Sequence, residues 1–145
     1  MIKKNGFSLI ELLIVLSILS VLLVIGGSIQ LKTYDNYQFN QWYTLFENDI
    51  LRMQQDAMIT KNNLYLLIKS SNNSYEIRKG AFGKPIIKRP IPDQWKVKLY
   101  SLDMPLSFSK HGTIRRPGRF QIISKYNKWE IIFPLGKGRC YVNEL

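Results

Sequence analysis

Glu11 is the residue whose type and position most need a chemical explanation. It is the only charged side chain between Lys4 and Lys32, in a mostly apolar run from Phe7 to Ile29. An ionisable group inside a membrane-spanning segment costs about 2.5–3.5 kcal/mol on insertion scales, so such groups usually have a partner or a function. We therefore expect Glu11 to pair with a cation. Snorkelling of its side chain toward the membrane surface is the alternative.

The other residue types that carry out chemistry are too few or too scattered to predict a catalytic or metal site. The chain has one cysteine, Cys140, and one histidine, His111, which argues against a zinc site or a Cys–His pair. The acids form no convergent constellation with a nucleophile. We expect no enzymatic activity, no metal and no cofactor. Cys140 is expected to be a partly buried apolar side chain, with an intermolecular disulfide as the alternative, and His111 a turn residue beside Gly112.

The apolar run around Glu11 is long enough to cross a membrane. Its 23 residues would form a helix of roughly 35 Å, which exceeds the thickness of a bilayer core. Lys3 and Lys4 before the run favour a cytoplasmic N-terminus. A secretory signal would have a shorter apolar core ending at an Ala-x-Ala-like site. A plain signal anchor would have no reason to carry a carboxylate near its start.

The residues around Glu11 resemble the processing signature of type IV prepilins and pseudopilins. The segment Lys3-Lys4-Asn5-Gly6-Phe7-Ser8-Leu9-Ile10-Glu11 has a basic leader ending in Gly, then Phe, a hydroxyl residue, two aliphatic residues and Glu. The resemblance implies that a prepilin peptidase cuts between Gly6 and Phe7 and N-methylates Phe7. In a filament of such helices, the Glu11 carboxylate would meet the new N-terminal amine of a neighbouring subunit.

After Lys32 the pattern becomes amphipathic. Apolar residues recur at alternating spacings of four and three, which predicts a stripe on one face of a helix; they are Phe39, Tyr43, Phe46, Ile50, Met53 and Ala57. We expect this stripe to pack on the chain's own C-terminal sheet. Glu47, Asp49 and Asp56 are expected to lie largely outside it and to form an acidic outer face for contact with neighbouring subunits.

From residue 63 onward the pattern predicts strands. We expect hairpins from Leu64–Lys69 with Tyr75–Lys79 and from Phe120–Ile123 with Trp129–Phe133. Shorter strands are expected at Ile86–Arg89, Trp95–Leu99, Leu106–Ser109 and Cys140–Val142, the second with one buried and one basic face. The predicted fold class is α+β, with a long N-terminal helix packed on a mainly antiparallel sheet.

The predicted organisation has four parts. Residues 1–6 are the leader peptide and residues 7–31 the transmembrane and assembly helix. Residues 32–62 form an amphipathic helix that continues into the globular domain, and residues 63–145 form the β-rich globular domain.

Basic charge is concentrated in this last part. The whole chain has a net charge of +11, whereas residues 61–145 contain 17 Lys and Arg against 5 Asp and Glu. Arg115, Arg116 and Arg119 surround Pro117-Gly118, which predicts an exposed loop. These arginines are candidates for contact with DNA through its phosphates or with a partner subunit, and the sequence favours the partner.

The C-terminal half narrows the resemblance. Phe108 to Gly112, Pro117-Gly118 and Leu135-Gly136-x-Gly138-Arg139 resemble the minor pseudopilins of Gram-positive competence machinery, the ComGD type. The resemblance is more distant to the minor pseudopilins of type II secretion. It implies a minor subunit of a DNA-uptake pseudopilus; a subunit of a type II-like secretion system or a type IV pilus is the alternative.

The same resemblance implies partners and a location. The partners are other major and minor pseudopilins, the prepilin peptidase, an assembly ATPase and an inner-membrane platform protein. The chain would be a single-pass membrane protein with a cytoplasmic N-terminus before cleavage. It would afterwards stand in a pseudopilus that crosses the cell wall to the cell surface.

Overall fold

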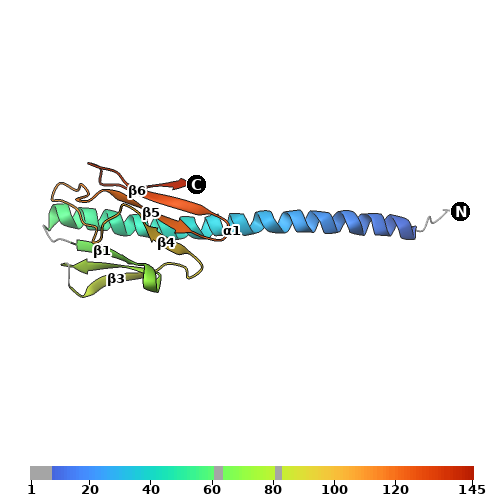
Figure 1. Ribbon diagram of the computed structural model, residues 1–145, viewed down its shortest axis with the longest axis horizontal. Helices are drawn as coiled ribbons and strands as arrows, with labels where there is room; N and C mark the ends of the chain where they lie inside the picture. Colours follow the sequence, from blue (N-terminus) through green and yellow to red (C-terminus); the bar gives the residue numbers. More distant parts are fainter. Residues whose placement is uncertain (1–7, 61–63, 81–82) are drawn as a thin grey trace. The chain divides into compact units, whose positions relative to one another are not determined.

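One long helix is followed by short strands, as Figure 1 shows for the computed structural model. The structure describes residues 8–60, 64–80 and 83–145. The helix α1 spans Leu9–Ile59, and the strands are β1 (Leu64–Lys69), β2 (Ser74–Lys79), β3 (Pro85–Pro90), β4 (Lys96–Leu99), β5 (Gly118–Ile123), β6 (Lys128–Phe133) and β7 (Tyr141–Glu144). A single turn of 3-10 helix, Ser70–Asn72, connects β1 to β2. This order confirms the α+β fold class.

The chain divides into two compact units, Met1–Tyr34 and Asp35–Leu145. Helix α1 contributes residues to both. In the second unit, the part of α1 from Asp35 to Ile59 supplies the helical layer that the strands cover. This second unit has its own apolar core.

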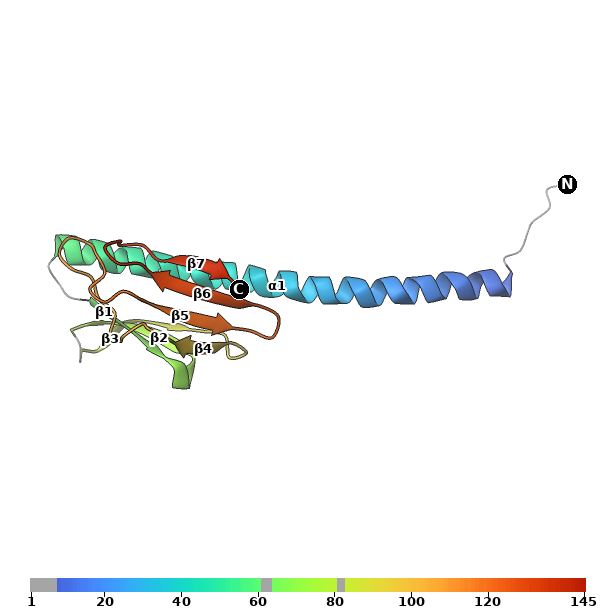
Figure 2. The same cartoon turned by 45° about the horizontal axis from the view of Figure 1, so that its top comes forward.

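The strands form two antiparallel sheets instead of the single sheet that the sequence predicted. One sheet has the order β1-β2-β3 and the other the order β4-β5-β6-β7, whose strands Figure 2 shows side by side. Pro90 is the last residue of β3 and Pro92 follows two residues later. Neither has an amide hydrogen to donate to a ladder. The amide of Ile91 between them donates to the carbonyl of Asn73 at 2.6 Å, so the chain leaves the first sheet there.

Both predicted hairpins are confirmed. Strands β1 and β2 pair from Leu64↔Lys79 to Lys69↔Ser74, and the left-handed backbone of Asn73 (φ 37°) closes the turn. Strands β5 and β6 pair from Gly118 to Ile123. In their loop, the Ser124 hydroxyl accepts from the amide of Asn127 at 2.9 Å, so polar side chains set these turns as their positions predicted.

The predicted stripe of α1 forms one side of the core. Five of its six residues are buried, and Tyr43 packs against them half-buried. The ring of Phe39 stacks on Trp129 of β6 with centroids 4.0 Å apart, and Phe46 meets Phe120 of β5 edge-on at 5.8 Å. Such aromatic pairs add about 0.5–1.5 kcal/mol beyond the area they bury.

Three strand predictions need correction. In β4 only the flanking Trp95 is fully buried, while Leu99 is 37% exposed, because β4 is an edge strand with one ladder partner. Residues 106–109 form two isolated bridges, Leu66↔Leu106 and Phe108↔Ile114, in place of a strand. The last strand begins at Tyr141, directly after Cys140.

Candidate functional site

Glu11 lies in the first turn of α1, and its side chain is exposed. A carboxylate at this end of a helix is favoured by the unpaired backbone amides and the helix dipole. The large apolar residues from Leu12 to Ile25 are exposed over more than half of their surface, from 76% at Val24 to 51% at Leu19. The other two predicted processing residues, Gly6 and Phe7, lie outside the described residues.

Two serines of the apolar run, Ser17 and Ser20, form hydrogen bonds within their own helix. The hydroxyl of Ser17 donates to the carbonyl of Ile14 at 2.7 Å, and that of Ser20 donates to Leu16 at 2.8 Å. This return to the helix backbone lets a hydroxyl sit in an apolar environment. Helix α1 is long and apolar enough to cross a membrane, and its exposed face requires lipid or other helices to cover it.

Asp49 is buried, so the predicted acidic outer face of α1 is incomplete. Its carboxylate accepts from the Tyr75 hydroxyl at 2.8 Å and from Arg89 Nε at 3.1 Å. The hydrogen bond to Asp49 raises the pKa of Arg89, and burial raises that of Tyr75. The charge of Asp49 therefore ties β2 and β3 to the helix.

Asp35 is a second buried acid of α1, and the sequence did not single it out. It is buried and accepts from Trp95 Nε1 at 3.3 Å, from Asn127 Nδ2 at 3.2 Å and from the Ser124 hydroxyl. It thus joins the start of the second unit to Trp95, the residue just before β4, and to the β5–β6 loop. Two of the four acids in residues 32–60 are consequently used inside the unit and do not face a partner.

The three candidate arginines are not equivalent. Arg119 lies on β5, not in a loop, and its guanidinium is 3.4 Å from Glu130 and over the Tyr100 ring at 6.0 Å. Arg115 and Arg116 are exposed and line a cavity of about 440 Å³ with Tyr65, Pro105 and Ser107. The structure therefore brings two of the three arginines together and pairs the third with an acid.

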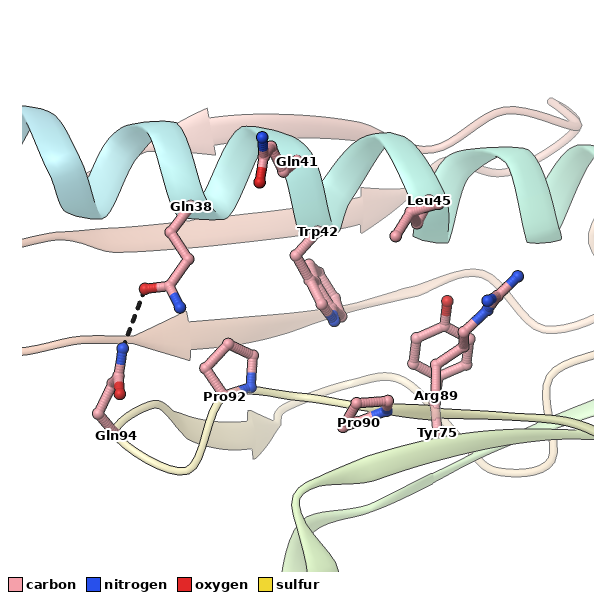
Figure 3. Close-up of a pocket in the computed structure, with 9 residues that line it drawn as sticks. All are labelled: Gln38, Gln41, Trp42, Leu45, Tyr75, Arg89, Pro90, Pro92 and Gln94. Atoms are coloured by element: carbon pink, nitrogen blue, oxygen red, sulfur yellow. Dashed lines mark hydrogen bonds between the residues drawn. The ribbon is translucent and has the colours of Figure 1, made fainter.

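A second cavity, of about 500 Å³, lies beside Trp42 between α1 and the end of β3 (Figure 3). Trp42, Leu45 and two prolines form its apolar surface, and Gln38 accepts a hydrogen bond from Gln94 across one end at 2.9 Å. The Trp42 Nε1 is buried without a hydrogen-bond partner among the described residues. This cavity could not be predicted from the sequence, because its residues come from three separate segments.

Cys140 lies in the apolar interior and His111 lies in a turn, as the sequence predicted. Cys140 is buried, with its sulfur 3.7 Å from the Tyr43 hydroxyl, and burial raises the pKa of its thiol to about 11. A thiol held protonated in this way is a poor nucleophile. His111 is exposed in a turn, where its amide donates to the Ser109 hydroxyl at 3.2 Å. Across residues 8–60, 64–80 and 83–145, no three His, Cys, Asp or Glu side chains gather into a metal site.

Two sequence comparisons agree with this architecture. Residues 1–27 match the family described as the prokaryotic N-terminal methylation motif. The chain is 29% identical over 140 residues to the competence protein ComGD of Bacillus subtilis (strain 168), covering 97% of this chain and 94% of that protein.

Two solved structures share the fold. The minor pseudopilin EpsH of the type 2 secretion system of Vibrio cholerae matches with a TM-score of 0.53 and 13% identity, over 70% of this chain and 92% of EpsH. The type IV minor pilin FimU of Pseudomonas aeruginosa PAO1 matches with a TM-score of 0.59 and 13% identity, over 75% and 90%. At this identity the likeness concerns the fold alone. Together with the methylation motif and the match to ComGD, this shared fold confirms the predicted resemblance to pilin-like proteins.

Proposed function

We propose that this chain, a pilin-like protein of the ComGD type, is a minor pseudopilin of a DNA-uptake apparatus. The observation that carries the proposal is the similarity to ComGD over 97% of the chain, together with the methylation motif at residues 1–27. The methylation motif alone would indicate only the processing of the chain. The globular fold alone would not indicate DNA uptake, because subunits of secretion systems and of pili share it.

Processing at the Gly6–Phe7 bond removes the leader and keeps the apolar helix. Gly6 has no side chain, so the backbone can approach the peptidase closely. The product has 139 residues, begins at Phe7, which is then N-methylated, and has lost the charges of Lys3 and Lys4. Within it, residues 7–31 serve as membrane and assembly helix, residues 32–62 lead into the globular domain, and residues 63–145 form its β-rich part.

The assembly role of Glu11 follows from its charge. In a bundle of apolar helices, the attraction between the Glu11 carboxylate and the Phe7 amine of a neighbour is stronger than in water. An unpaired carboxylate is costly in the same environment, and desolvation offsets part of the gain even in a pair. The pairing thus favours one register of neighbouring helices over others.

The remaining parts of the proposal concern partners and topology. Other pseudopilins cover the exposed apolar face of α1, and an ATPase and a platform protein drive assembly. Before cleavage, the lysines of the leader hold the N-terminus in the cytoplasm. The basic second unit then stands beyond the membrane, in a pseudopilus that crosses the wall to the cell surface.

Deletion of the gene tests the function most simply. We expect the deletion strain to lose uptake of labelled DNA and to regain it when the gene is supplied on a plasmid. Retained DNA uptake with a loss of protein export would contradict the proposal and favour a subunit of a secretion system.

Processing has its own test, the mass of the chain in cells that contain the peptidase. Gly6→Leu should leave only the uncut form, whereas the parent should begin at an N-methylated Phe7. An uncut parent in such cells would contradict the prepilin interpretation. Ser8→Ala is a matched control beside the same bond and should be cut.

A further inference from the structure

The cavity beside Arg115 and Arg116 has the composition of an anion site. Its residues come from β1 (Tyr65), from the connection between β4 and β5 (Pro105 and Ser107) and from the residues just before β5. Its volume of about 440 Å³ lies in the range of about 300–1,000 Å³ found for small-molecule sites. Both charged residues that line it are cations, so an anionic group is the ligand that it favours.

Most of the donors that the two arginines bring to this cavity are free to bind a ligand. Arg116 makes no hydrogen bond or ion pair to the described part of the chain. Arg115 Nε donates to the carbonyl of Phe108 at 3.1 Å, which holds the guanidinium in place. Its terminal nitrogens form no bond to any described residue.

Ser107 is the second observation that points to a ligand. The residue is only 7% exposed, and its hydroxyl makes no hydrogen bond within residues 8–60, 64–80 and 83–145. The hydroxyl is not one of the fully buried, unpartnered side-chain atoms of these residues, so it keeps access to the cavity that Ser107 lines. It can therefore donate to a ligand there without breaking an existing hydrogen bond. Two guanidinium groups and a free hydroxyl are together the donor set that binds phosphate oxygens.

We propose that this cavity, with Ser107, Arg115 and Arg116 as its donors, binds a phosphodiester group of a DNA strand. The inference rests on the proposed function, which brings the chain into contact with DNA. The net charge of +12 in residues 61–145 would attract the polyanion from a distance. The cavity would then fix one phosphate in position, without reading the base sequence.

Arg119 distinguishes binding at this cavity from nonspecific attraction of DNA to the positive charge of the second unit. Because its guanidinium is paired with Glu130, it should contribute less to phosphate binding than the two arginines of the cavity. The sequence offered all three arginines as candidates for contact with DNA or with a partner subunit and favoured the partner. The proposed phosphate site uses only Arg115 and Arg116, together with Ser107, which the sequence did not single out.

The test measures binding of the full chain, in an uncharged detergent, to a short fluorescent DNA duplex at several salt concentrations. Arg116→Gln should weaken binding about fivefold and lower the slope of log K against log salt by about one. Ser107→Ala should weaken binding about threefold with the slope unchanged, since it removes a donor and no charge. Neither variant should lower the melting temperature, because neither side chain has a partner in the described structure.

Lys98→Gln is the matched control, since it removes one exposed cation of β4 outside the cavity. Equal weakening by Lys98→Gln and Arg116→Gln, with Ser107→Ala like the parent, would overturn the site. Poly(glycerol phosphate), a phosphodiester polymer without bases, is the second probe. Binding of this polymer as tightly as DNA, at equal phosphate concentration, would overturn the assignment to DNA.

Failure of this site and failure of the proposed function give different results. Co-purification with other pilin-like subunits should be unchanged in Ser107→Ala and Arg116→Gln. If DNA binding does not depend on the cavity while gene deletion still abolishes uptake, the inference fails and the proposed function stands.

Discussion

The two units of this chain differ in whether their apolar side chains are exposed or buried within the chain itself. In residues 8–34 the described apolar side chains of α1 are exposed, and the hydroxyls of Ser17 and Ser20 bond only to their own helix. In Asp35–Leu145 the aromatic residues of the core pack against one another, and even two acids of the helix are buried with partners. The second unit has a core of its own, whereas the first must obtain one from lipid or from other chains.

This difference separates folding from assembly. A substitution in the second unit should act on the stability of the isolated chain. A substitution in the first should leave that stability nearly unchanged and act on insertion or on contact with other subunits.

Truncation of a core aromatic residue should produce the largest change in stability. Phe46→Ala removes a ring that packs against Trp42 and Phe120 and should lower the free energy of unfolding by about 3–5 kcal/mol. Leu16→Ala, at a side chain that is 52% exposed, should change it by less than about 0.5 kcal/mol. Chemical denaturation of both chains in the same detergent makes the comparison. Equal losses would mean that the first unit has a core of its own.

A tight contact between loops and helix in the second unit should give an intermediate effect. A Cβ on Gly138 would collide with Gln54 Nε2 and the carbonyl of Gly112, which are themselves joined by a hydrogen bond of 2.7 Å. Gly138→Ala should therefore cost about 2 kcal/mol. Gly136→Asn is the control, since that position has φ +73° and no atom within 4 Å of an added Cβ. Asparagine tolerates this conformation, so the melting temperature of the control should stay close to that of the parent.

The smallest expected effect is a loss of stability in acid. Hydrogen bonds from Arg78 and Lys69 hold the pKa of Glu76 below its ordinary value of 4.5. Its stabilising contribution is thus complete above pH 4.5 and is lost as the pH falls through the lower pKa of the folded state. Glu76→Gln should flatten the fall of the melting temperature below pH 4.5. A fall as steep as that of the parent would assign the acid sensitivity to other carboxylates.

The sequence predicted those parts of the fold that depend on local patterns. The stripe of α1 and both hairpins follow from spacing and turn residues. The separation into two sheets does not, since it depends on how segments far apart in the chain pair. Arg119 was expected in a loop because Pro117-Gly118 is typical of a turn, whereas Gly118 is the first residue of β5.

The burial of Asp35 and Asp49 could have been predicted from their spacing, but charged residues are normally expected on the surface. Asp35 lies four residues before Phe39, and Asp49 lies three after Phe46, so both continue the helical spacing of the buried stripe. Their hydrogen-bond partners are known only from the structure and offset the cost of burying the two carboxylates. These partners include Trp95 and Asn127 for Asp35, and Tyr75 and Arg89 for Asp49. The cavity at Ser107 was equally inaccessible to sequence analysis, because three segments separated along the chain build it.

The central claim, that the first unit is completed by other subunits through a charge pair at Glu11, has one direct test. Glu11→Gln should still insert into the membrane, since it removes a charge from an apolar segment. It should co-purify with the other pilin-like subunits much less than the parent does. Asp103→Asn, at an exposed acid of the second unit outside α1, should co-purify as the parent does. Undiminished co-purification of Glu11→Gln would contradict the claim.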